Sequence, residues 1–170
     1  MKKLIAAVAL AALTGTAFAQ LAPLSGVTID KNTSLPVHWL AQGQPKDKAA
    51  VKTVLLENGK SKSVTFAPTI HVIDFFGNTI DMEAGDEFTL TVKIKGKGKV
   101  NLAYFGYKTN NQYLFFHKGK DVILTGEEQT ISEKFTVKNG KDYPTGKIRP
   151  SIRINKDTVC EITSITLTEE

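Results

Sequence analysis

Residues 87–107 read EFTLTVKIKGKGKVNLAYFGY, and this stretch decides the fold class. Its first half alternates apolar with polar residues, the apolar ones being Phe88, Leu90, Val92 and Ile94. Its second half repeats the alternation with Val100, Leu102 and Tyr104. A period of two places the apolar side chains on one face of a strand. The two glycines of Gly96-Lys97-Gly98 predict a hairpin turn between two such strands.

The same period continues toward the C-terminus. The apolar positions there are Ile148, Ile152, Ile154, Ile162, Ile165 and Leu167. Turn signals such as Asn58-Gly59 and Asn139-Gly140 separate these runs at intervals of roughly 8–12 residues. The pattern predicts an all-β fold, an antiparallel β-sandwich or a barrel. Lys46–Leu56 fits a short helix or a loop that runs into a strand, and the pattern leaves both open.

Length and composition indicate one ordinary folded domain. The chain has 170 residues, 41% of them hydrophobic and 23% charged, which excludes a disordered or fibrous protein. The single cysteine, Cys160, cannot form an intramolecular disulfide, so a hydrophobic core has to stabilise the fold. Cys160 follows Val159 in a strand pattern and is expected to be a small buried apolar residue rather than a nucleophile.

The first residues, MKKLIAAVALAALTGTAFAQ, have the features of a secretory signal peptide. Two lysines precede a short apolar run, and Ala17-Phe18-Ala19 matches a cleavage site. We predict a signal peptide over residues 1–19, an N-terminal segment over 20–26 and one β-sandwich domain over 27–168. The protein is then secreted or periplasmic after cleavage following Ala19. No later apolar stretch is long enough for a membrane span.

The motifs that would announce an enzyme are absent from the sequence. It contains no GxSxG, HExxH, EF-hand or P-loop pattern, so we expect a protein that is not an enzyme. His38, His71 and His117 are interpreted as half-buried structural residues, and the aspartates as turn residues. The formal charge of +5 is spread along the chain. The alternating run Lys93–Lys99 is typical of a solvated strand face, and no nucleic-acid partner is expected.

Aromatic residues are concentrated in VNLAYFGYKTNNQYLFFHKG, residues 100–119. Alternation places Phe105 and Tyr107 opposite the core positions of their strand. It groups Tyr113 with Phe115 on the next strand, facing away from Phe116. Rings beside amide and guanidinium groups suit sugar recognition, because a pyranose stacks its C–H face on a ring while its hydroxyls form hydrogen bonds. The alternative is that the rings thicken the core under a loop.

Several segments together resemble carbohydrate-binding modules of the 4/9 type, a group of galactose-binding-like jelly rolls. The resemblance lies in the order of six stretches: SLPVHWL (34–40), MEAGDEFTLTVKIKG (82–96), KVNLAYFGY (99–107), LTGEEQTISEKFTV (124–137), KIRPSIRI (147–154) and VCEITSITLTEE (159–170). It implies an antiparallel β-sandwich of jelly-roll type. It also implies a secreted, lectin-like, non-catalytic protein that binds an oligo- or polysaccharide.

The resemblance further implies where the ligand-binding residues lie. On the faces of the matching strands that point away from the core stand Asn101, Phe105, Tyr107, Tyr113, Arg149 and Arg153. Trp39 is interpreted either as a platform for the ligand or as part of the core. Related jelly rolls often hold one structural calcium, whose ligands the sequence does not assign. The alternative function is a β-sandwich that binds an envelope or extracellular protein through the same aromatic residues.

Overall fold

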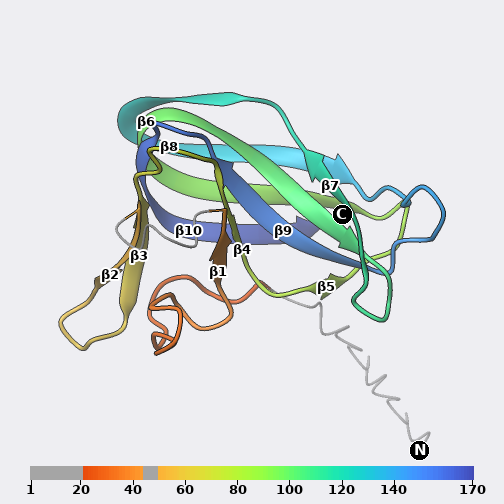
Figure 1. The fold of residues 1–170 in the computed structure, drawn as a ribbon, viewed down its shortest axis with the longest axis horizontal. Helices are drawn as coiled ribbons and strands as arrows, with labels where there is room; N and C mark the ends of the chain where they lie inside the picture. The colour runs from red at the N-terminus through yellow and green to blue at the C-terminus, as the bar shows by residue number, and fades with distance from the viewer. Residues whose placement is uncertain (1–20, 44–49) are drawn as a thin grey trace, which may run out of the picture.

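The computed structural model describes residues 21–43 and 50–170, which fold into antiparallel β-structure (Figure 1). The predicted signal peptide lies outside the described residues. The strands are β1 (Leu40–Gln42), β2 (Val51–Leu55), β3 (Ser61–Phe66), β4 (Ile73–Phe76), β5 (Ile80–Asp81), β6 (Glu87–Tyr107), β7 (Tyr113–Lys118), β8 (Val122–Thr136), β9 (Lys147–Ile154) and β10 (Val159–Glu169). Within this part of the chain, no helix is long and apolar enough to cross a membrane.

The long strand β6 corrects the predicted hairpin at Gly96-Lys97-Gly98. Residues 87–107 form one strand, which bends at these glycines instead of reversing. Gly98 has φ +118°, and a Cβ there would lie 2.6 Å from the Cα of Thr158. The absence of a side chain therefore lets the turn before β10 approach the bend closely. The buried Thr158 holds it there, because its hydroxyl oxygen accepts a hydrogen bond from the Lys99 amide at 2.9 Å.

The bend divides the strands into two layers. The main path of hydrogen-bonded neighbours is β1-β4-β9-β6-β10-β3-β2. The first half of β6 pairs with β10 and β8, and its second half pairs with β9 and β7. The first layer thus contains β2, β3, β10, β8 and the first half of β6. The second layer contains β1, β4, β5, β9, β7 and the second half of β6. This all-β antiparallel jelly-roll sandwich confirms the predicted fold class.

The core lies between the layers and uses the predicted positions. Phe88 in the first layer meets Tyr104 in the second at a ring-centroid distance of 5.5 Å, and Phe66 meets Phe75 at 5.0 Å. The predicted apolar positions of β6 and β9 are buried, namely Phe88, Leu90, Val92, Ile94, Val100, Leu102, Tyr104, Ile148, Ile152 and Ile154. Burial of apolar surface of this kind is the main stabilising contribution to a fold without a disulfide.

The edges of the predicted elements differ slightly from the structure. Leu21 and Leu24 are buried in the core, so packing begins upstream of residue 27. The C-terminal part of Lys46–Leu56 is the strand β2, and residues 44–49 lie outside the described residues. Asn58-Gly59 forms the turn between β2 and β3, as predicted.

Candidate functional site

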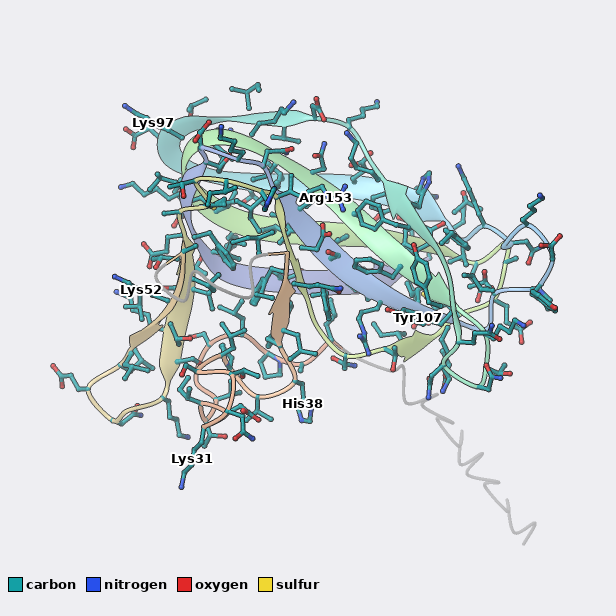
Figure 2. All side chains as sticks on the ribbon, viewed as in Figure 1. Lys31, His38, Lys52, Lys97, Tyr107 and Arg153 are labelled. Atoms are coloured by element: carbon teal, nitrogen blue, oxygen red, sulfur yellow. The ribbon has the colours of Figure 1, made fainter. Side chains whose placement is uncertain are left out.

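Aromatic side chains and two arginines gather on the outer side of the second layer. We call this surface the aromatic face and define it by Phe76, Phe105, Tyr107, Tyr113, Phe116, Arg149 and Arg153. Strand pairing aligns them in rows across the sheet, because Phe105 lies opposite both Arg149 and Phe116 while Tyr107 lies opposite Tyr113. Figure 2 shows Arg153 and Tyr107 on the layer that β9 and the second half of β6 form. Four strands therefore bring residues from positions 76–153 together on one surface.

The rings of the aromatic face touch but are not coplanar. Phe105 is central, with centroid distances of 4.9 Å to Phe116, 5.5 Å to Phe76 and 6.3 Å to Tyr113. Tyr107 meets Tyr113 edge-on, at 6.0 Å and an interplanar angle of 73°. Tyr113 is the most open ring, with 54% of its surface exposed. The arrangement offers one broad ring for stacking beside a second phenol, rather than a flat row of parallel rings.

An irregularity in β7 corrects the predicted grouping of the aromatic residues. The register shifts so that Tyr107 pairs with Tyr113 while Gly106 pairs with Phe115, which leaves Leu114 as an extra residue. Such a β-bulge reverses the side on which the following residues point. Tyr113 therefore shares its face with Phe116, whereas Phe115 turns inward, where its ring meets that of Tyr104 at 5.8 Å.

Arg153 is neutralised within the aromatic face. Its Nε and Nη2 donate hydrogen bonds to the two carboxylate oxygens of Asp74, both at 2.7 Å. Its guanidinium lies 4.1 Å from the centroid of the Phe116 ring. The ion pair to Asp74 is the main reason that the pKa of Arg153 is raised. This paired, planar arrangement holds Phe116 and β4 against β9 and gives Arg153 a positioning role.

Arg149 differs from Arg153 in having no acidic partner. Its guanidinium carbon lies 5.2 Å from the Phe76 centroid and 5.3 Å from the Tyr107 centroid, so two rings hold the group. Among the described residues it forms no ion pair with a carboxylate. Its Nε and the Oγ of neighbouring Ser151 are buried without a hydrogen-bond partner. Arg149 is thus a cation that two rings hold in place and that has no ion-pair partner among the described residues.

Two of the residues predicted to bind ligand lie away from any open surface. Asn101 is fully buried, where its side chain donates hydrogen bonds to the Lys120 carbonyl at 2.9 Å and to Asp121 Oδ1 at 2.6 Å. Trp39 is only 1% exposed, stacks on Phe75 at 4.9 Å and belongs to the core. Asn101 therefore anchors a loop, and Trp39 fills the interior. The other five predicted residues, Phe105, Tyr107, Tyr113, Arg149 and Arg153, lie together on the aromatic face.

The remaining polar candidates take structural or surface places. His38 and His71 are exposed rather than half-buried, because both lie in loops, whereas His117 is half-buried against Tyr104. Burial lowers the pKa of His117. Cys160 is buried, and burial raises the pKa of its thiol to about 12, as expected for an unreactive residue. Among the residues that the structure describes, no group of three His, Cys, Asp or Glu could hold a metal ion.

Residues that sequence reasoning did not assign to the site complete the face. Phe76 and Asp74 come from β4, a strand of only four residues, Ile73–Phe76, with too few positions for a clear alternation. Regular alternation puts Phe116 on the side opposite Tyr113, because the bulge at Leu114 leaves no mark in the apolar pattern. The sequence does contain a chemical signal for these residues, because arginine prefers carboxylates and aromatic rings as partners, and Asp74 and Phe116 are such partners for Arg153.

Comparisons with known proteins support the fold described above. No protein-family model and no curated protein matches this chain. A CBM4 structure matches with a TM-score of 0.53 at 17% identity, over 88% of this chain and 95% of that one. The CBM22-1 and GH10 modules of Clostridium thermocellum xylanase 10B, solved with xylohexaose, match with a TM-score of 0.56 at 15% identity, over 89% of this chain.

A third structure extends the same likeness. The enzymatically active domain of tailspike protein 4 from bacteriophage CBA120 matches with a TM-score of 0.58 at 13% identity, over 79% of this chain. The chain spans 20% of the tailspike structure and 28% of the xylanase structure. What these proteins share with this chain at such low identity is the fold. The structure is thus similar to carbohydrate-binding modules over most of its described length.

Proposed function

We propose that this protein binds a glycan on the aromatic face and does not catalyse a reaction on it. The observation that carries the proposal is the gathering of Tyr107, Tyr113, Phe105 and Arg149 on one sheet surface. Exposed rings beside fixed hydrogen-bond donors match the mixed chemistry of a sugar, which has an apolar C–H face and a polar rim. Similarity of fold to carbohydrate-binding modules, CBM4 among them, adds support.

Each residue of the face has a separate role in the proposal. Tyr113 is the stacking ring, because it is half exposed and stands at the end of the row. Tyr107 and Arg149 lie together in the next strands and donate hydrogen bonds to hydroxyl groups. Phe105, Phe116 and the Arg153–Asp74 pair lie beside these groups on the same face and support them. A mainly preformed site of this kind needs little reorganisation when a ligand binds.

The proposal extends to where the protein works. A signal peptide over residues 1–19, cleaved after Ala19, would deliver it to a periplasm or outside the cell. Extracellular and cell-wall polysaccharides occur in those places. The structural calcium that the resemblance implies stays a prediction, so binding is measured with and without this ion.

The first experiment is a glycan array and affinity-gel screen of the purified protein, with and without calcium. The proposal expects a specific hit that Tyr107→Ala or Arg149→Ala abolishes while the thermal midpoint changes little. Loss of folding in these variants would make the residues structural. Failure to bind any glycan would instead favour a protein partner on the same rings, and co-purification of a stoichiometric envelope protein would then test the alternative.

A further inference from the structure

The two arginines of β9 provide an internal comparison. Arg153 and Arg149 point to the same side of one strand, four residues apart. Two nitrogens of Arg153 donate hydrogen bonds to the Asp74 carboxylate, whereas Arg149 has no carboxylate partner among the described residues. A guanidinium that is half-buried and unpaired loses hydration without gaining an opposite charge. On the aromatic face, no carboxylate of the described residues therefore pairs with Arg149.

The groups around Arg149 do not supply that charge. Phe76 and Tyr107 hold the guanidinium through their ring faces, which orient it but carry no net charge. Burial raises the pKa of Tyr107 despite the nearby Arg149 charge, so the phenol stays neutral at pH 7. Lys147 pairs with Tyr107 in the ladder, and its own charge faces Asp81, whose Oδ1 lies 3.9 Å from the Lys147 Nζ.

Space for a substituent exists beside Arg149. A cavity of about 350 Å³ borders it, and its lining includes Thr33, His38 and Thr79. The one carboxylate in this lining is Asp30, whose Oδ1 accepts hydrogen bonds from the amides of Asn32 at 2.8 Å and Thr33 at 3.0 Å. These two amides lower the pKa of Asp30 and hold its carboxylate in the Asp30 turn, and the ion pairs of the described residues do not include one between Asp30 and Arg149. Asp30 therefore acts in its own turn and is not the partner of Arg149.

We infer that the aromatic face takes an acidic glycan, whose carboxylate or sulfate group pairs with Arg149. This inference rests on the proposed function and names the class of its ligand. A guanidinium binds either anion through two parallel hydrogen bonds. A neighbouring sugar ring of the same glycan then stacks on Tyr113. The anion then pairs with Arg149 as the Asp74 carboxylate pairs with Arg153.

The test measures the dissociation constant of the purified protein by calorimetry for matched pairs of polysaccharides. Polygalacturonate, alginate and hyaluronate are each compared with their carboxyl-reduced, neutral forms. A sulfated galactan is compared with its desulfated form, which separates the two kinds of anion. We expect at least one acidic form to bind tenfold or more tightly than its neutral counterpart. In Arg149→Gln we expect this preference to fall to threefold or less, and in Arg149→Lys to lie between.

A charge-matched control separates recognition from general attraction. Lys93→Gln also removes one positive charge, but from the exposed outer side of the first layer. It should leave the acidic preference unchanged. Equal affinity for acidic and neutral forms, or a preference that survives in Arg149→Gln, would overturn this inference and leave the proposed function standing. Failure to bind any glycan, neutral forms included, would overturn the proposed function and this inference together.

Discussion

The outer surfaces of the two layers follow the same alternation but carry different chemistry. The outer side of the first layer, here called the polar face, is built from Thr89, Thr91, Lys93, Lys95, Glu128, Thr130, Ser132, Thr166 and Thr168. Most of these residues are exposed, and pairs such as Thr91 and Ser132 join only by surface hydrogen bonds. The aromatic face instead contains rings and two arginines in mutual contact.

This difference shows which positions carry information about function. Most residues of both layers that point inward are apolar because both layers have to fill one core. The residues that point outward are free of that demand, so hydrated threonines and lysines are sufficient on the polar face. Rings and a cation without a counter-charge add nothing that the core needs. Their collection on one surface therefore points to a ligand.

The largest effect is expected at the bend of β6, which divides the layer with the polar face from the layer with the aromatic face. Gly98→Ala introduces a Cβ against Thr158 at a positive φ, and we expect it to lower the free energy of unfolding by about 3 kcal/mol. Urea denaturation measures this loss. The matched control is Gly85→Ala, since Gly85 also has a positive φ, +100°, but no atom within 4 Å of an added Cβ. Equal losses in the two variants would contradict a close approach at the bend.

The next effect concerns the ligand. Tyr113→Ala removes the exposed ring of the aromatic face, and we expect glycan affinity to fall tenfold or more, or about 1.4 kcal/mol or more. The thermal midpoint should change little, because half of this ring is in solvent. Lys93→Ala makes a similar truncation on the polar face and should alter neither affinity nor stability beyond about 0.5 kcal/mol. If both variants weakened binding alike, the two faces would not differ in function.

A smaller effect is expected from the Arg153–Asp74 ion pair of the aromatic face. Asp74→Asn leaves the Arg153 guanidinium without its carboxylate, and we expect a loss of about 1 to 2 kcal/mol in the free energy of unfolding. The estimate is reduced from that of a fully buried pair because the Arg153 and Asp74 side chains are 26% and 13% exposed. Denaturation of the single variants and of Asp74→Asn combined with Arg153→Gln separates pairing from local packing. Additive losses would contradict a coupled pair.

The effect that is smallest at neutral pH lies under the polar face, at the buried Cys160. Its pKa is raised to about 12 in the folded protein, against about 8.5 for a free thiol. Above pH 8.5 the unfolded chain loses this proton while the folded chain keeps it, so stability falls as pH rises toward 12. We expect up to about 1 kcal/mol per pH unit from this group. Urea denaturation at pH 8–11 should show a steeper decline than in Cys160→Ala, and identical slopes would contradict a closed core there.

The sequence predicted the fold class and five residues of the aromatic face because a period of two is preserved wherever a sheet is regular. Its failures occur where pairing is irregular. The alternation of Phe88 to Tyr104 runs unbroken through Gly98, which indicates one strand, yet two nearby glycines suggested a hairpin. The bulge at Leu114 and the depth of Trp39 depend on contacts between distant segments, and local pattern does not contain them.

The single strand β6 also sets how the molecule folds. It pairs with β7, β8, β9 and β10, and the last two begin 40 or more residues after it ends. The first layer is not complete until β10 has paired with β6, and the second is not complete until β9 has, so most pairing is nonlocal and the entropy of loop closure opposes it. All-β chains of this kind fold in milliseconds to seconds rather than microseconds. Until β10 pairs, one hydrogen-bonding edge of the first half of β6 stays open to pairing with another chain, which makes the docking of β10 the step that protects the folding protein from aggregation.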